Sequence, residues 1–253
     1  MRNVVLFFCI YVCYVRAAPC LTTDSGEETI LADNPVGFYR LNDLQQDAMT
    51  CTAAGCPDGN YIGNPTLGQP GVAPPPNVQD PSVEFNYDPL LGIFLTGQAA
   101  RIAYDDAINP QSFSIEMWAK PRDVTLQRYM FSSLNTLTNS GVDLYIGPEA
   151  VINCEVGNGA GTVTASGGLL GHLAVVVNWN HIVCTYNETT DTLSLYADNV
   201  LLDSQSPVGF VRNTQLPITF AAQSDGSNEY AGNLDEIAIF DFELTPQQIE
   251  QHW

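Results

Sequence analysis

The stretch Tyr230-Ala-Gly-Asn-Leu-Asp-Glu-Ile-Ala-Ile-Phe-Asp-Phe-Glu-Leu-Thr-Pro-Gln-Gln-Ile-Glu-Gln-His-Trp253 decides the fold, because it predicts a strand, a short turn and a capped terminal helix. Thr245 is a suitable N-cap, and Pro246 has the φ preferred at the first helical position. Gln248 stands three residues after the cap, where its side chain can reach back to the cap's backbone N–H. We therefore expect a short helix to close the chain.

The predicted strand over residues 233–240 carries apolar residues on both of its faces. Alternation separates its side chains into two sets: Leu234, Glu236, Ala238 and Phe240 on one face, and Asp235, Ile237 and Ile239 on the other. Because neither face is wholly polar, this strand is typical of the interior of a two-sheet sandwich.

The rest of the chain repeats this strand pattern. Short apolar or alternating runs separated by turn residues occur at 82–85, 101–104, 113–120, 129–133, 142–146, 151–156, 162–166, 172–177, 181–186, 192–197, 200–203, 218–222 and 230–240. Almost no helical period occurs among them, so the sequence predicts an all-β sandwich of two antiparallel sheets. Residues 47–81 are rich in Gly, Pro, Asn and Asp and predict a long surface loop.

The N-terminus has the charged, apolar, small-residue order of a secretory leader. A basic residue precedes an apolar run from Val4 to Val15, and two alanines follow it. An uncleaved anchor is the alternative, but this run is shorter than the roughly 20 residues that a membrane-spanning helix needs. We expect residues 1–17 to be a signal peptide, residues 18–32 to be an acidic arm without periodicity, and the product to be secreted, with no transmembrane segment.

The composition is strongly acidic. The net charge is −20, and it becomes −22 once the two arginines of the predicted leader are removed. Such a charge excludes nucleic acid and anionic membrane surfaces as favoured partners. It is compatible with calcium ligands, with cationic partners, with a salty medium or simply with a solvated surface.

Five cysteines remain after the predicted leader, in a chain expected to fold in an oxidising compartment. Cys51 and Cys56 flank a short loop segment and are the easiest pair to close. Cys154 and Cys184 each lie on the apolar phase of a predicted strand, which suits a buried disulfide between strands; buried free thiols are the alternative. Cys20 is left over in the acidic arm, where it would be able to join a disulfide-linked partner.

Several spaced segments together are similar to a known family. They are residues 32–41, 113–121, 179–187, 193–199 and 232–240, followed by the closing helix. These segments resemble the laminin G-like jelly roll of the concanavalin A-like lectin and glucanase superfamily. The resemblance covers residues 33–253 and implies one antiparallel jelly-roll domain with a short C-terminal helix.

A ligand surface is expected on the strand over residues 113–120. Glu116 and Trp118 share one of its faces, where the ring would stack on a sugar and the carboxylate would accept hydrogen bonds from hydroxyl groups. In the alternative, a loop or the C-terminal helix covers Trp118, which then serves in packing.

The resemblance also implies a structural calcium ion near the start of the domain. Asp235 matches the aspartate of the family's motif, and Asp33 and Asn34 would supply further oxygen ligands of the kind calcium prefers. The alternative for Asp235 is a carboxylate that only accepts hydrogen bonds from the backbone.

The residues that carry catalysis in glucanases of this fold are not reproduced. Those enzymes use two carboxylates on one face of a strand. Here Glu116 stands alone, and adjacent Asp235 and Glu236 are predicted to point to opposite faces. We therefore expect no enzyme, although a diverged glucanase-like hydrolase remains an alternative.

The sequence thus predicts a secreted, non-enzymatic module that binds a carbohydrate or an extracellular protein. A structural or assembly protein of a surface or particle, which uses Cys20 or a sheet edge, is the second alternative. Asn187 begins the sequon Asn-Glu-Thr at a predicted hairpin tip, where a glycan would be exposed.

Overall fold

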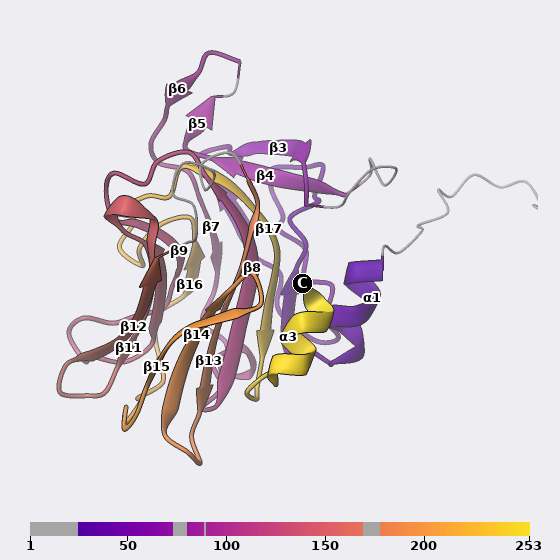
Figure 1. Ribbon diagram of the computed structural model, residues 1–253. Coiled ribbons are helices and arrows are strands. Elements are labelled where there is room, and N and C mark those ends of the chain that lie inside the picture. The colour runs from indigo at the N-terminus through magenta and orange to yellow at the C-terminus, as the bar shows by residue number, and fades with distance from the viewer. Residues whose placement is uncertain (1–24, 73–79, 89, 169–177) are drawn as a thin grey trace, which may run out of the picture.

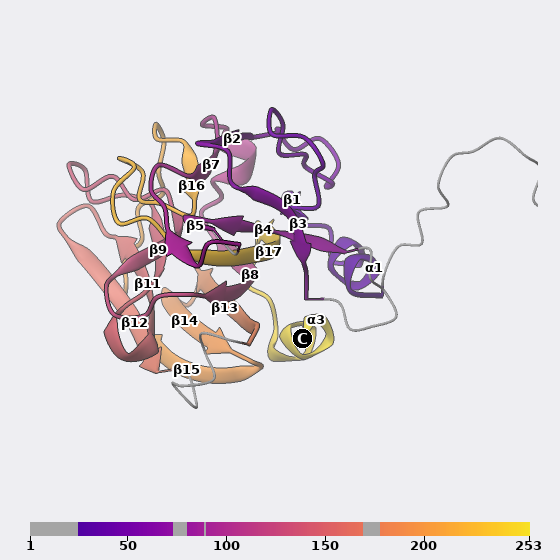
Figure 2. The same ribbon diagram turned by 90° about the horizontal axis from the view of Figure 1, so that it is seen from above.

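The computed structural model describes residues 25–72, 80–88, 90–168 and 178–253, which form two antiparallel sheets packed face to face (Figures 1 and 2). Across the eight-stranded sheet lie β15 (Val200–Gln205), β14 (Thr192–Ala197), β13 (Asn180–Asn187), β8 (Phe113–Pro121), β17 (Gly232–Phe240), β4 (Pro81–Phe85) and β3 (Thr66–Pro70), with β1 (Gly37–Tyr39) also paired to β17. Across the seven-stranded sheet lie β12 (Thr162–Gly168), β11 (Val151–Gly157), β10 (Val142–Ile146), β9 (Arg128–Ser132), β16 (Ile218–Phe220), β7 (Ala99–Ile102) and β2 (Asn60–Ile62). The predicted all-β sandwich is confirmed.

Few other elements occur in the described residues. A separate hairpin joins β5 (Tyr87–Asp88) to β6 (Ile93–Phe94), and two 3₁₀ turns span Asp106–Ile108 and Pro148–Ala150. The helices are α1 (Ser25–Ala32) and α3 (Pro246–His252). In α3 the predicted capping box is confirmed, because the Thr245 hydroxyl accepts from Gln248 N at 3.3 Å and Gln248 Oε1 accepts from Thr245 N at 2.9 Å.

The space between the sheets is filled by the apolar phase of their strands. Its members include Phe85, Met117, Phe131, Leu144, Ile152, Phe220 and Ile237. The disulfide between Cys154 and Cys184 joins β11 of one sheet to β13 of the other, with 6.2 Å between the Cα atoms. This predicted pair is confirmed, and it links the two sheets through the core.

A bulge in β17 changes the predicted phase of that strand. The pairing of β17 with β8 shifts register between Asp235 and Ala238, and Glu236 has a φ of 48°. As a result Leu234 shares the inner face with Ile237, instead of lying on the face of Ala238 as strict alternation predicts.

A second apolar cluster lies between the outer face of the eight-stranded sheet and the two helices. It contains Ile30 of α1, Phe240 of β17 and Ile249 of α3, and the helices lie side by side over the sheet (Figure 1). The expectation of an acidic arm over residues 18–32 is therefore wrong for residues 25–32, which form a packed helix. The predicted leader, Cys20 and the predicted strand over 172–177 lie outside the described residues.

The expected long loop over residues 47–81 contains two edge strands, so this expectation needs correction. β2 pairs with β7 at the edge of the seven-stranded sheet, and β3 pairs with β4 at the edge of the eight-stranded sheet. The predicted disulfide between Cys51 and Cys56 is confirmed, with 6.0 Å between the Cα atoms. Among the described residues, no helix is long and apolar enough to cross a membrane.

Candidate functional site

Glu116 lies in a buried polar contact between β8 and α3. It is 1% exposed, and its Oε2 lies 2.9 Å from His252 Nδ1 and 3.7 Å from His181 Nε2. His252 Nε2 in turn lies 3.1 Å from Asp33 Oδ2. Burial alone would lower the pKa of His252, but hydrogen bonds and charge from Glu116 and Asp33 raise it.

The expectation of a ligand-binding groove beside Glu116 is therefore wrong. Because α3 covers the carboxylate, a ligand has no access to it, and Glu116 instead anchors the C-terminal helix. Trp118 remains partly exposed on the same face, and its ring lies against His181 with 4.9 Å between centroids. The two residues therefore do not form one open surface.

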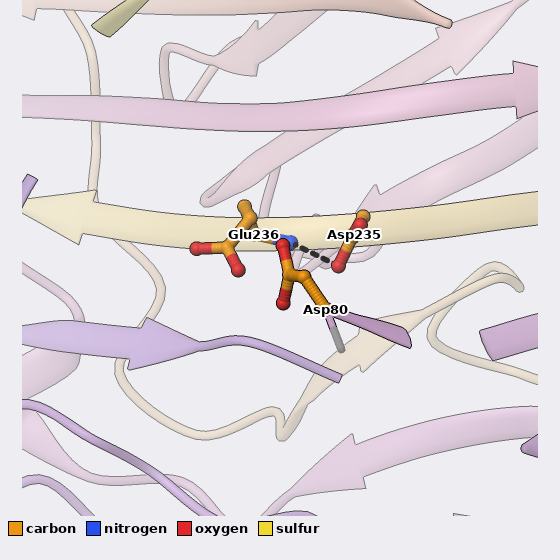
Figure 3. Close-up of side chains that lie close together, drawn as sticks. All are labelled: Asp80, Asp235 and Glu236. Atoms are coloured by element: carbon orange, nitrogen blue, oxygen red, sulfur yellow. Dashed lines mark hydrogen bonds between the residues drawn. The ribbon is translucent and has the colours of Figure 1, made fainter. Parts of the chain in front are cut away.

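Three other carboxylates meet where β17 bulges (Figure 3). One oxygen each from Asp80, Asp235 and Glu236 lies within 4.8 Å of the others, and all three residues are buried. Asp235 Oδ1 accepts from Glu236 N at 3.1 Å, and Asp235 Oδ2 accepts from Val72 N at 3.0 Å. The bulge thus brings Asp235 and Glu236 to one place, although alternation predicted opposite faces.

Arg40 binds this carboxylate cluster from the side of β1. Its Nε donates to Glu236 at 2.9 Å, its Nη2 to Asp80 at 2.7 Å and its Nη1 to Glu27 of α1 at 2.9 Å. Burial, followed by the charges of Glu236 and Asp80, raises the pKa of Asp235 well above its ordinary value. The guanidinium of Arg40 therefore binds three carboxylates, and Asp235 lies beside two of them.

The structure does not bring Asp33 and Asn34 to Asp235, as the calcium site predicted from the sequence required. Asp235 lies in the carboxylate cluster, whereas Asp33 faces His252 and Asn34 donates to Ala32 O at 3.2 Å. The carboxylates that lie beside Asp235 are those of Asp80 and Glu236. The sequence carried no signal for Asp80, because its position depends on pairing between β3 and β4.

The outer face of the seven-stranded sheet carries polar and aromatic side chains. Cross-strand pairing forms one row of Tyr129, Tyr145, Asn153 and Ser166, and a second row of Ser132, Asp143, Glu155 and Thr164. The rings of Tyr129 and Tyr145 stack with 4.9 Å between centroids, and Ser166 Oγ donates to Asn153 Oδ1 at 2.7 Å. Both helices lie over the other sheet, so neither covers these rows (Figures 1 and 2).

Asp143 is buried on this face, as are Ser132 and Tyr129. It is fully buried, and the turn that follows β16 lies above its row, because Ser224 N donates to Ser132 Oγ at 2.9 Å. Burial raises the pKa of Asp143 to about 7, and the charge of neighbouring Glu155 contributes in the same direction. Alternation in residues 142–146 already places Asp143 and Tyr145 on the polar phase, and this was the available sequence signal.

Asn187 lies at the end of β13, where the turn to β14 begins, so the predicted hairpin is confirmed. Its Nδ2 donates to Glu243 at 2.7 Å, and its Oδ1 accepts from Thr189 N at 2.8 Å. This turn lies at the opposite end of the sandwich from the β5–β6 hairpin (Figure 1). Glycosylation of Asn187 stays a prediction.

The two sheets and the closing helix define a jelly-roll sandwich domain. A family model described as the concanavalin A-like lectin/glucanases superfamily matches residues 95–250, which is more than half of the chain. The chain therefore belongs to this superfamily, as the sequence motifs predicted.

Several solved structures that share this fold are binding domains of toxins. The botulinum neurotoxin serotype G binding domain has a TM-score of 0.66 and 12% identity, covering 87% of this chain and 51% of that one. The binding domain of Paraclostridial Mosquitocidal Protein 1 has a TM-score of 0.63 and 16% identity, covering 87% and 52%. The binding domain of botulinum neurotoxin DC in complex with SialylT has a TM-score of 0.60 and 14% identity, covering 86% and 50%.

These similarities concern the fold alone, and the chain spans about half the length of the solved structures it matches. No curated protein matches the chain.

Proposed function

We propose that this protein is a secreted, non-enzymatic binding module that recognises a carbohydrate on the outer face of the seven-stranded sheet. The observation that carries the proposal is the row in which the partly exposed ring of Tyr145 stacks on the buried ring of Tyr129 and lies beside Asn153. Aromatic rings that stack on a sugar, beside amide and carboxylate groups that bind its hydroxyls, are typical of carbohydrate sites. The binding-domain neighbours, one in complex with SialylT, support the same class of function.

Binding is favoured over hydrolysis by the burial of one member, Asp143, of the nearest carboxylate pair. Asp143 and Glu155 lie opposite each other on β10 and β11, as a pair of catalytic carboxylates would. Asp143 is fully buried, and its Oδ1 accepts from Leu134 N at 3.3 Å. For hydrolysis, both carboxylates would have to contact the bond that is cleaved. The turn after β16 covers Asp143 and separates it from solvent.

Replacing Tyr145 with alanine is expected to weaken carbohydrate binding about tenfold, which corresponds to about 1.4 kcal/mol. The substitution removes the partly exposed ring of the row while β10 keeps its backbone pairing. A glycan array of the purified protein identifies the sugar, and calorimetry on that sugar measures both affinities. Tyr104→Ala, which removes a partly exposed ring after β7, is the control.

Two results would contradict this proposal. One is an array without any bound glycan. The other is release of reducing ends from a polysaccharide by the pure wild-type protein, with loss of that release in Glu155→Gln.

We also propose that the carboxylate cluster of Asp80, Asp235 and Glu236 holds a calcium ion. Three carboxylate oxygens close to one another are the hard donors that calcium prefers. Ionisation of Asp235 is opposed by burial and by its acidic neighbours, and a bound cation would favour it. The three carboxylates would supply part of the roughly six to eight oxygen ligands that calcium takes, and the ion would tie the β17 bulge to the segment before β4.

Calcium is expected to stabilise the fold by about 2.7 kcal/mol when its free concentration is a hundredfold above Kd. For a domain of this size the midpoint of thermal unfolding would then rise by roughly 5–10 °C. Calorimetric scans in calcium and in chelator measure the shift. Asp235→Asn should abolish it and Asn34→Ala should keep it, because Asn34 lies outside the cluster. The same midpoint with and without calcium would refute the site.

A further inference from the structure

The β5–β6 hairpin presents large apolar side chains to the outside. It forms a sheet of its own and stands beyond the ends of both large sheets (Figure 1). Leu90 is 94% exposed, Leu91 70%, Ile93 47% and Phe94 57%. Residues 90–94 have no polar side chain. Contiguous exposed apolar surface of this kind marks a contact with a partner molecule or a lipid surface.

The backbone donors of the tip are satisfied inside the hairpin. Asp88 Oδ1 accepts from Leu90 N at 2.8 Å and from Leu91 N at 3.0 Å, and Asp88 O accepts from Gly92 N at 2.7 Å. Gly92 has a φ of 67°, which closes the turn. Such turns are common in loops exposed to water, and in a hydrocarbon medium the pairing is required, because each unpaired donor is costly there.

The base of the hairpin is amphipathic and held in place. The Tyr87 ring meets Phe94 edge-on at 5.5 Å, and the Arg122 guanidinium lies 4.9 Å from the centre of the Tyr87 ring. Arg122 Nε also donates to buried Glu84 at 2.8 Å. Tyrosine and arginine next to an apolar tip are the residues that suit the boundary between lipid and water.

We propose that the β5–β6 hairpin inserts its tip into an electrically neutral phospholipid surface. The net charge of −20 opposes binding to an anionic membrane, and it equally opposes association with a second copy of the chain. A stable protein interface buries about 800 Å² on each partner, which is more than four side chains on one short hairpin supply alone. A neutral lipid surface needs neither opposite charge nor a matching pocket.

Flotation with phospholipid vesicles tests the proposal. Wild-type protein should float with vesicles of pure phosphatidylcholine and bind less to vesicles that also contain phosphatidylserine. The double variant Leu90→Ser/Leu91→Ser should reduce the floated fraction at least fivefold. The matched control, Leu44→Ser/Leu137→Ser, changes two leucines that are 86% and 92% exposed elsewhere and should float like the wild type.

Wild-type protein that stays at the bottom of the gradient would overturn the proposal. The partner of the hairpin tip would then be a pocket of another protein. Equal loss of flotation in the control variant would overturn it as well. Thermal unfolding of both double variants shows whether the sandwich is intact, since neither pair is buried. Carbohydrate binding measured on the same samples is expected to be unchanged, so this test is independent of the proposed carbohydrate site.

Discussion

Arg40→Ala is expected to lower the free energy of unfolding by about 3–5 kcal/mol, because it leaves buried carboxylates without their cationic partner. In the folded protein the guanidinium binds Glu27, Asp80 and Glu236, which come from α1, the segment before β4 and the bulge of β17. Loss of Arg40 would therefore also loosen the contacts among these three segments. Urea unfolding followed by tryptophan fluorescence measures the change.

Arg212→Ala is the matched control for this prediction. Arg212 pairs with Asp106 at 2.9 Å, but Arg212 is 36% and Asp106 70% exposed. Exposed ion pairs contribute little to stability, because water solvates both charges in either state. Similar losses in the two variants would show that the Arg40 cluster behaves as a surface network.

The sequence predicted those features that depend on local pattern. Alternating runs identified most strands, and the order Thr245, Pro246 and Gln248 identified the capped helix. Both disulfides followed from cysteines placed in a loop or on the apolar phase of a strand. In each case a few neighbouring residues contain the physical cause, so a pattern is sufficient.

The missed features depend on contacts between distant segments. The bulge at Glu236 places a residue other than glycine at positive φ, and the local sequence does not indicate it. Asp80 joins Asp235 only through the arrangement of β3, β4 and β17. Glu116 was expected on an open face, but the packing of α3 makes it a buried partner of His252.

The outer face of the seven-stranded sheet also combines features that local sequence predicts with features that depend on distant segments. Each polar residue there was visible as one member of an alternating run, for example Asp143 or Tyr145. Their assembly into two rows needs the register among β9, β10, β11 and β12, which arises from pairing of strands. A candidate carbohydrate surface made from several strands is therefore a property of the fold, and it emerges only with the structure.

The double variant Cys154→Ala/Cys184→Ala is expected to lose about 3–4 kcal/mol of stability, because the native bond closes a loop of 30 residues and restricts the unfolded chain. The bond also joins the two sheets within the core, so its loss removes a direct link between them. Unfolding in urea, without reductant, measures the difference. The midpoint should fall while the fold and its β content remain.

Cys51→Ala/Cys56→Ala provides the matched comparison, since that bond closes a segment of only 5 residues. In the loop-entropy account it contributes about 2 kcal/mol, less than the bond between the sheets. The order of the two stability losses thus tests the loop-entropy account more strongly than either loss alone. Equal losses would show that strain or native packing, and not the length of the closed loop, determines what each disulfide contributes.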